Sequence, residues 1–319
     1  AKGVEPQTEK LMNVCRMRKT PVIVFVNKMD RPAGDPFSLM DEIENQLKIK
    51  VRPLSWPINN GPEFKGVYNI FNKSLKLFTP DIQTIEERIK FEDISDPRLE
   101  DYIGNDAQTL RDELELVEGV YPEFDKNDYL NGNLAPVFFG SALYNFGVQE
   151  LLDAFLKIAP SPRPSFTEER EIKPDEYHFT GFVFKIHANI DPNHRSRIAF
   201  VKICSGMFVR NNIYKHIRSG KTMRISSPTA FMASQKETID EAFPGDIIGV
   251  PDTGNFIIGD TITDGEEIHF KGLPSFSPEL FRYVENADPM KSKQLAKGVD
   301  QLMDEGVAQL FTSQFNGRK

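Results

Sequence analysis

The sequence predicts a multi-domain protein in which an α/β domain with an inserted subdomain is followed by a β-barrel and then by the start of an α+β domain. The chain has 319 residues, more than one ordinary domain contains. Its first half alternates apolar strands with helical patterns, whereas its second half has short strands separated by turn residues. A proline-rich segment, Ala159–Ser165, lies between them. We expect domains at residues 1–165, 166–275 and 276–319, with the insert at about 52–133.

The composition is that of a globular protein, with 39% hydrophobic and 27% charged residues. The longest clean apolar run, Val22–Val26, is far shorter than the roughly 20 residues of a membrane span, so no membrane partner is expected. The two cysteines, Cys15 and Cys204, form no metal or redox motif, which favours a reduced, cytoplasmic location. The net charge of −8 argues against DNA as a partner but permits a local basic face.

The elements of the first half follow a repeated order of strand, loop and helix. Val22–Val26 is apolar without alternation, which is typical of a strand buried on both faces of a parallel sheet, and Pro136–Phe139 repeats this pattern. Asp35 and Pro36 are suited to the N-cap and first position of a helix. The helices expected around these strands are Pro6–Arg18, Pro36–Leu47 and Val148–Ile158.

The insert is too patterned to be a loop, since it contains a strand-like segment, Phe64–Phe71, and a helix near Pro97–Glu118. After the linker, six or so strands over about 95 residues predict a barrel. Its expected strands include Phe179–Ile186, Ile198–Cys204, Ile213–Ile217, Ile247–Val250 and Thr261–Ile262. The last segment predicts a strand (Glu279–Val284), a helix capped by Asp288 and a strand (Val307–Phe311), which is half of an α+β domain.

A polar motif, N-K-x-D, follows the first buried strand directly. Ligands of open α/β sheets bind at the carboxyl ends of strands, and Asn27, Lys28 and Asp30 lie at such an end. The Asp30 carboxylate can accept hydrogen bonds from both N1–H and the exocyclic amine of guanine. Adenine lacks this pair of donors and would leave the carboxylate unpaired. The stem of Lys28 can cover the base, and Asn27 can tie the loop to its neighbours.

A second loop, Ser141–Ala142–Leu143, follows the other buried strand and would complete a guanine pocket. There the backbone N–H of Ala142 would meet guanine O6. The alternative interpretation is structural: N-K-x-D could be a polar turn closing a strand, and S-A-L alone is a weak signal.

The sequence contains no phosphate-binding motif of the form G-x-x-x-x-G-K-S/T. The segment Asp101–Gly104 fits D-x-x-G as a string, but it lies in the expected insert helix and is interpreted as chance. A base pocket is thus predicted without a phosphate cradle, a magnesium ligand or a positioned water, all of which a GTPase needs.

The residues around these motifs resemble translational GTPases, and several resemble the bacterial peptide chain release factor 3 family, whose members are similar to elongation factor G. The resemblance is carried by Val22–Arg31, Asp35–Asn45, Trp56–Gly61 with Phe64–Tyr68, Gly181–Ile186 with Asp191–Arg195, and Pro278–Arg282. It covers the whole chain but only the middle of such a protein. We therefore expect an internal fragment that lacks the phosphate-binding part.

The resemblance implies a multi-domain fold: the C-terminal portion of a P-loop-type GTPase domain with its insert, a translation-factor β-barrel, and the start of a ferredoxin-like α+β domain. It implies GTP and GDP as ligands, with magnesium held by residues outside this chain. It also implies binding to the ribosome, including ribosomal RNA, and release of the decoding release factors after termination. The nucleotide-binding residues that it transfers are Asn27, Lys28, Asp30, Ser141, Ala142 and Leu143; no catalytic residue or metal ligand transfers.

Two alternatives stay open at this point. One is an elongation-type or ribosome-protection GTPase of similar architecture. The other is a non-catalytic ribosome-binding module made of the guanine pocket and the barrel, and we expect the 319 residues alone to be inactive in GTP hydrolysis.

The charges of the barrel are split along the sequence, with basic residues gathered in 185–224 and acidic residues in 225–270. One interpretation is a basic surface for ribosomal RNA, with Asn193–Arg197 as the RNA-facing loop. The other is a barrel exterior on which the charges mix in three dimensions. None of the five histidines has the spacing of a metal site.

Overall fold

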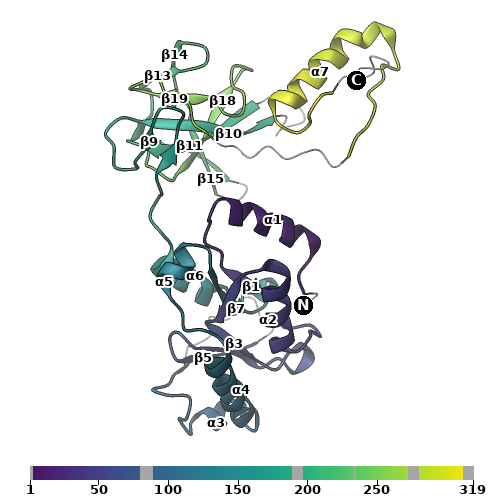
Figure 1. Cartoon of the computed structure of the whole chain (residues 1–319), viewed down its shortest axis with the longest axis vertical. Coiled ribbons are helices and arrows are strands. Elements are labelled where there is room, and N and C mark those ends of the chain that lie inside the picture. Colours follow the sequence, from purple (N-terminus) through teal and green to yellow (C-terminus); the bar gives the residue numbers. More distant parts are fainter. Residues whose placement is uncertain (1–2, 80–88, 189–196, 233–234, 272–279, 312–319) are drawn as a thin grey trace. The chain divides into compact units, whose positions relative to one another are not determined.

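A computed structural model describes residues 3–79, 89–188, 197–232, 235–271 and 280–311. The chain divides into two compact units, residues 1–160 (unit 1) and 161–319 (unit 2) (Figure 1). This division falls within the expected proline-rich linker, while the three-domain division stays a prediction. Within the described residues, no helix has the length and apolar character needed to cross a bilayer.

The centre of unit 1 is a parallel sheet of three strands in the order β1 (Val24–Val26), β7 (Leu134–Phe139), β2 (Lys50–Pro53). Both expected strands are present. β7 is buried along its whole length, as predicted. β1 is only partly buried because it lies at the edge of the described sheet, where Val24 and Phe25 stay half-exposed.

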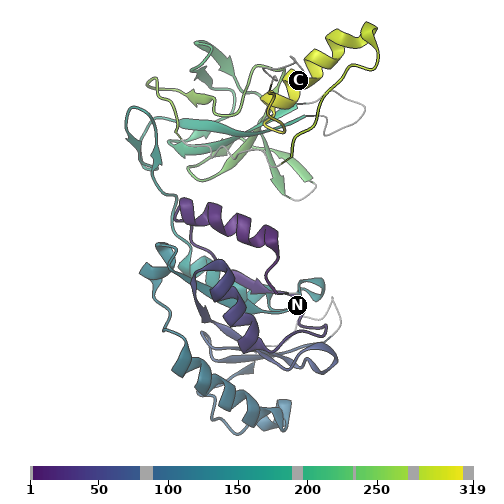
Figure 2. The ribbon, with the colours of Figure 1, turned by 45° about the vertical axis from the view of Figure 1, so that its right-hand side comes forward.

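Three helices cover this sheet: α1 (Pro6–Met17), α2 (Pro36–Leu47) and α6 (Val148–Ile158) (Figure 2). All three expected helices are confirmed, and the bounds differ only at the C-terminus of α1, which ends one residue earlier than predicted. Asp35 caps α2 as predicted, since its Oδ2 accepts a hydrogen bond from the Ser38 N–H at 2.9 Å. Residues of α1 and α2 join one core cluster, and Ala154 of α6 packs in another with Phe138.

The insert forms an antiparallel sheet in the order β3 (Ser55–Ile58), β4 (Gly66–Asn69), β5 (Ser74–Leu77), β6 (Ile89–Lys90). Its helices are α3 (Leu99–Ile103), α4 (Asp106–Val120) and α5 (Lys126–Leu130). The prediction of a single helix near 97–118 was wrong. Gly104 adopts a left-handed φ of +65° after α3, which ends that helix before α4 begins.

The first residues of the segment expected as the insert, about 52–133, lie in β2. Arg52 pairs with Pro136 and Pro53 with Val137, so these residues belong to the parallel sheet. The insert sheet therefore begins after β2, with β3.

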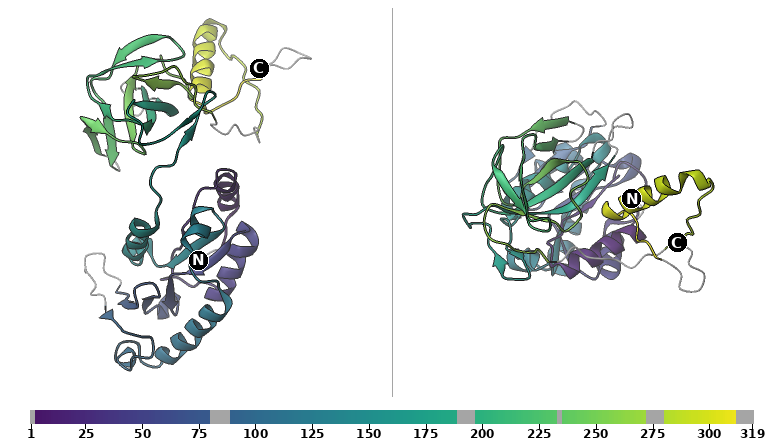
Figure 3. Two further views of the ribbon diagram at one scale, coloured as in Figure 1. Left: turned by 60° about the vertical axis from the view of Figure 1, so that its left-hand side comes forward. Right: turned by 90° about the horizontal axis from the view of Figure 1, so that it is seen from above.

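Unit 2 is built around a curled, barrel-like sheet of eight strands in the order β14-β13-β19-β10-β11-β18-β15-β16 (Figure 3). Its core includes Phe179, Val201, Ile248 and Ile262. All five named barrel strands are confirmed. The remaining strands are polar or very short, so hydrophobic alternation did not reveal them. The strands of unit 2 are β8 (Ser165–Phe166), β9 (Glu171–Ile172), β10 (Thr180–Ala188), β11 (Arg197–Ser205), β12 (Phe208–Val209), β13 (Ile213–His216), β14 (Lys221–Arg224), β15 (Thr229–Met232), β16 (Gln235–Thr238), β17 (Glu241–Ala242), β18 (Ile247–Asp252) and β19 (Thr261–Thr263).

The C-terminal region contains a short 3-10 turn, η3 (Pro289–Lys291), and helix α7 (Ser292–Asp304). Asp288 was expected to cap a helix; it caps this turn instead, because its Oδ1 accepts a hydrogen bond from the Met290 N–H at 3.0 Å, and the N-cap of α7 is Lys291. The two flanking strands are not formed in residues 280–284 and 307–311, the described parts of those predictions. The Phe281 and Phe311 rings nevertheless lie 6.0 Å apart, so the two segments come close without a strand ladder.

Arg197 does not face RNA, which corrects the prediction for the loop Asn193–Arg197. Its side chain is 11% exposed, and its Nε lies 2.8 Å from Oδ2 of the fully buried Asp252 side chain. Its Nη2 donates to the Phe256 carbonyl at 2.5 Å. Residues 193–196 lie outside the described residues. Arg197 is therefore a structural residue of the barrel.

The charges of the barrel mix in three dimensions, as the alternative interpretation held. Ion pairs join the basic segment 185–224 to the acidic segment 225–270. The pairs are Arg197–Asp252, Arg210–Asp240, Lys215–Glu267 and Arg218–Asp260. The split along the sequence thus gives no evidence of a continuous basic surface.

Replacing Arg197 by Met should destabilise unit 2 by about 3 kcal/mol, because the Asp252 carboxylate would stay buried without its cation. Lys202→Met is the control, since Lys202 is exposed on the same strand, and it should cost less than about 0.5 kcal/mol. Hydrogen exchange of the β10 and β11 amides in a urea series measures both effects. Equal stability of the two variants would contradict the structural role of Arg197.

Candidate functional site

The ends of β1 and β7 bring the two predicted loops together. The Gly140 N–H donates to the Val26 carbonyl at 3.1 Å, which extends the ladder one residue beyond β7. The Met29 N–H then donates to the Gly140 carbonyl, also at 3.1 Å. Asn27–Asp30 and Ser141–Leu143 therefore lie side by side at the carboxyl edge of the sheet, where ligands of α/β folds bind.

Asn27 ties the two loops directly. Its Oδ1 accepts hydrogen bonds from the Lys28 N–H at 2.7 Å and from the Ala142 N–H at 2.9 Å. The Ala142 N–H, which the sequence predicts to meet a guanine O6, is therefore already bound to Asn27 in this structure. A base could use this donor only by sharing it with Asn27 or displacing that side chain.

Two buried polar atoms of the site have no hydrogen-bond partner among the described residues. They are Oδ1 of Asp30, whose side chain is 13% exposed, and Oγ of the fully buried Ser141. Among the described residues, the carboxylate has one cation within 4.0 Å, Arg31, whose Nε lies 4.0 Å from Oδ2, which is a loose contact. An unsatisfied buried acceptor costs about 1–3 kcal/mol, so native proteins rarely leave one without water or ligand. Both atoms fit a polar ligand at this edge.

Lys28 and Leu143 frame the site without being fixed in it. Lys28 is exposed and has a left-handed φ of +68°, which lifts its side chain out of the strand direction. Leu143 is 61% exposed in the short 3-10 turn η2 (Ala142–Tyr144). The long aliphatic stem of Lys28 can therefore lie across a planar base.

The S-A-L loop depends on a close backbone approach at Gly140. A Cβ at this position would lie 2.3 Å from the Phe146 carbonyl oxygen and 2.8 Å from the Phe25 ring. Only glycine allows the loop to fold back so tightly. A turn signal is present in the sequence here, but it does not identify Phe146 as the reason for the glycine.

A residue from the insert also contacts the site, and sequence reasoning missed it. The Gly61 N–H donates to the Met29 carbonyl at 2.8 Å. Gly61 begins η1 (Gly61–Glu63), just after β3. The two residues are far apart in the sequence, so no local pattern connects them.

Comparison with known families agrees with this geometry. A family model described as the elongation factor Tu GTP binding domain matches residues 1–161, half of the chain. The chain belongs to this family. A model for elongation factor G domain 2 matches residues 178–265, and one for the C-terminal domain of class II release factor RF3 matches residues 270–319. The resemblance to translational GTPases and the predicted multi-domain fold class are confirmed.

A solved structure has the same fold as this member of the GTP-binding family. It is a crystal structure of a protein from Thermus thermophilus, which superposes with a TM-score of 0.72 at 20% sequence identity. The match covers 99% of this chain and 47% of that one, so the chain spans about half the length of its structural relative.

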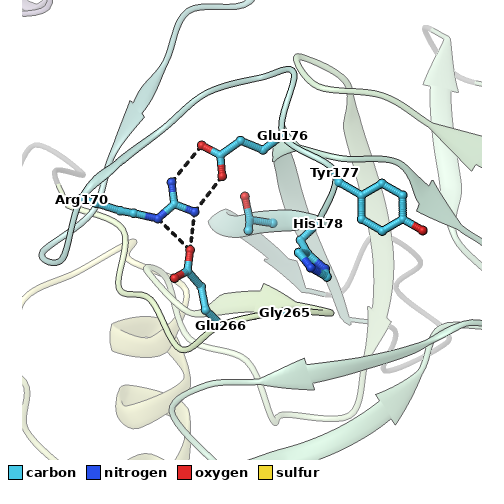
Figure 4. Close-up of a pocket in the computed structure, with 7 residues that line it drawn as sticks. Arg170, Glu176, Tyr177, His178, Gly265 and Glu266 are labelled. Atoms are coloured by element: carbon cyan, nitrogen blue, oxygen red, sulfur yellow. Dashed lines mark hydrogen bonds and ion pairs between the residues drawn. The ribbon is translucent and has the colours of Figure 1, made fainter.

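A pocket of about 520 Å³ in unit 2 is a second candidate site (Figure 4). Arg170 crosses it, but all five of its N–H donors are engaged: by Glu176 at 2.7 and 2.9 Å, by Glu266, and by the Glu171 carbonyl. These hydrogen bonds lower the pKa of Glu176 to about 2. The guanidinium is saturated by carboxylates, so the pocket does not provide an anion site.

Three side chains of unit 2 have metal-binding atoms close together, although the histidine spacing did not suggest it. Ligand atoms of Glu168, Glu169 and His269 all lie within 4.8 Å of one another, and all three residues are exposed. Oε1 of Glu169 lies 2.8 Å from His269 Nδ1, and its Oε2 accepts from the His269 N–H at 2.9 Å. The Glu169–His269 contacts satisfy this carboxylate without an ion.

The pKa values of Glu169 and His269 should shift in opposite directions. Their hydrogen bond raises the pKa of His269 above the ordinary value of 6.5 and lowers that of Glu169 to about 2. Any stabilisation through His269 is thus present below pH 6.5 and lost as the pH rises through its folded pKa. Any stabilisation through Glu169 is lost as the pH falls below about 4.5 toward 2.

Nuclear magnetic resonance of the His269 imidazole tests this pair. In Glu169→Gln, the pKa of His269 should fall toward its ordinary value, because the anionic acceptor is gone. The wild-type chain, measured under the same conditions, is the reference. An unchanged His269 titration in the variant would show that the ion pair does not form.

Proposed function

We propose that this chain provides the guanine-recognition part of a GTP- and GDP-binding translational GTPase that acts in termination. The observation that carries the proposal is the Asp30 carboxylate. Its Oδ1 is buried at the joined ends of β1 and β7 and has no hydrogen-bond partner among the described residues; the same holds for Oγ of Ser141 in the neighbouring S-A-L loop. The family match over residues 1–161 supports guanine nucleotide as the ligand.

Asp30 would select guanine by pairing with two donors. Its carboxylate would accept from N1–H and from the exocyclic amine, which converts an unsatisfied buried acceptor into a charge-assisted pair. Lys28 would cover one face of the base, and Asn27 would hold the two loops at their present spacing. Ser141 Oγ and the shared Ala142 N–H are the groups proposed for the remaining polar edge.

Hydrolysis is proposed for a protein in which these residues are joined to a phosphate-binding loop and a magnesium site. The present sequence contains no phosphate-loop motif, and no magnesium ligand is assigned to it. Magnesium would neutralise charge on the phosphates when bound. The contribution of this chain is to bind and orient the base.

A role in termination is favoured by the match of residues 270–319 to the C-terminal domain of class II release factor RF3. We propose that the protein acts in the cytoplasm on the ribosome, including its RNA, and promotes dissociation of the decoding release factors. An elongation-type or ribosome-protection GTPase is the sibling alternative, which shares the match to elongation factor G domain 2. A non-catalytic ribosome-binding module is the alternative of another class.

Replacing Asp30 by Asn should change the base preference of the site from guanine to xanthine. The carboxamide would donate to the xanthine C2 carbonyl but would repel the guanine amine. The wild-type chain should bind GDP at roughly millimolar affinity, about −4 kcal/mol, through base and ribose contacts alone. Changes in the amide chemical shifts of the chain during titrations with GDP and with xanthosine diphosphate measure this change in base preference. Asp41→Asn, an exposed change on α2, is the charge-matched control.

If Asp30→Asn and wild type respond equally to GDP, Asp30 does not read the base. Equal binding of ADP and GDP by the wild-type chain would contradict the proposal in the same way.

The 319-residue chain itself should release no phosphate from GTP above the uncatalysed rate, because base contacts do not stabilise the transferring phosphoryl group. A phosphate-release assay with and without magnesium checks this. Turnover by the chain that is lost in Asp30→Ala would show that it contains a phosphate site after all.

A further inference from the structure

The guanine loop is held by the inserted subdomain as well as by β7. The Gly61 N–H donates to the Met29 carbonyl at 2.8 Å, and Oδ1 of Asn60 accepts from the Ala33 N–H at 3.3 Å. Both contacts come from the segment Asn59–Gly61, which follows β3 and is here called the insert turn. It thus contacts the chain on both sides of Asp30.

The geometry of Gly61 shows how closely the two backbones approach. Gly61 is buried and has a φ of +63°, a conformation that side chains disfavour. A Cβ at this position would lie 3.2 Å from the Pro32 nitrogen and 3.3 Å from the Pro32 Cα. Only a glycine fits here without moving the guanine loop.

The insert turn is itself anchored at its other end. Oδ2 of Asp106, the first residue of α4, lies 2.5 Å from Nζ of Lys65, which follows the turn. Hydrogen bonds from Lys65 and then from Asn59 lower the pKa of Asp106. The Lys65 N–H also donates to the Ile58 carbonyl at 2.9 Å, which closes the hairpin. The turn is therefore joined to the start of α4.

Met29 links the insert turn to Asp30, because its backbone is held on both sides. Its side chain is fully buried, its N–H is bound by the Gly140 carbonyl at 3.1 Å, and its own carbonyl is bound by Gly61. The carbonyl belongs to the peptide plane that Met29 shares with Asp30. The peptide on the other side of Asp30 is held as well, since the Arg31 N–H donates to the Lys28 carbonyl at 3.1 Å. With both peptide planes held, the rotation about the backbone of Asp30 is restricted, and so is the direction in which its side chain leaves the backbone.

We propose that Asn60 and Gly61 are positioning residues for base recognition. They fix the orientation of the Asp30 carboxylate. The selectivity of the site for guanine therefore depends on a turn of the inserted subdomain. This inference rests on the proposed function. It adds that the insert contributes to nucleotide selectivity without touching the nucleotide.

The preference for GDP over inosine diphosphate measures how well the Asp30 carboxylate is oriented toward the base. Hypoxanthine, the base of inosine diphosphate, differs from guanine only in lacking the exocyclic amine. A twofold-or-less preference is expected in Gly61→Ala and Asn60→Ala, against about tenfold in the wild-type chain. Gly104→Ala is the matched control: Gly104 has the same left-handed φ of +65°, but a Cβ there meets nothing within 4 Å. This control should keep the wild-type preference.

Fluorescence of the sole tryptophan verifies that each variant is folded. Trp56 lies fully buried on β3, next to the insert turn. Asn60→Ala removes a hydrogen bond without imposing backbone strain, so it tests the proposal if Gly61→Ala unfolds. Wild-type preference in the folded variants, or an equal loss in Gly104→Ala, would overturn the proposal.

Amide exchange separates this inference from the proposed function. Suppose the wild-type chain shows no preference for GDP over inosine diphosphate, so that the proposed function fails. Exchange of the Asp30 and Arg31 amides should still rise about tenfold in Gly61→Ala and not in Gly104→Ala if the insert turn positions this loop. Equal exchange in both variants would overturn the positioning role itself.

Discussion

The parallel pairing of β1 with β7, extended by hydrogen bonds past the last residue of each strand, is the constraint on which the rest of the site depends. It places Met29 against Gly140 and Asn27 against Ala142. Backbone groups make the Met29 bonds, and both partners, Gly140 and Gly61, lie where a Cβ would press on neighbouring atoms. What the side chains add is a carboxylate and a hydroxyl that are buried without protein partners among the described residues. A rigid frame with unsatisfied acceptors is the pattern expected of a preformed ligand site.

Local signals in the sequence predicted much of this frame. Asp35 and Pro36 marked the start of α2, since helix capping involves only neighbouring residues. Strand β2 was missed because Lys50 and Arg52 look polar and exposed. Arg52 is in fact buried, with Nη2 bonded to Oε1 of Glu118 at 2.5 Å. That partner lies 66 positions away, so no local pattern could reveal it. Gly61 was missed for the same reason.

The barrel shows how charge along a sequence can mislead. Arg197 and Asp252 lie in segments of opposite charge, yet β11 and β18 pair them directly in the sheet. An antiparallel sheet brings distant segments together, so residues that look like a basic face can neutralise an acidic one. Any basic surface of unit 2 must therefore be sought among charges without such partners. The candidate site at the ends of β1 and β7 depends on no such argument, because a hydrogen bond between Asn27 and Ala142 joins its two loops.

The most direct measurement is a crystal structure of the 319-residue chain soaked at high concentration in GDP. The Asp30 carboxylate oxygens should lie within about 3 Å of guanine N1 and of the exocyclic amine, with Asn27 still joining the two loops. A base bound elsewhere, or an Asp30 side chain turned away from Ser141 with nucleotide present, would contradict it.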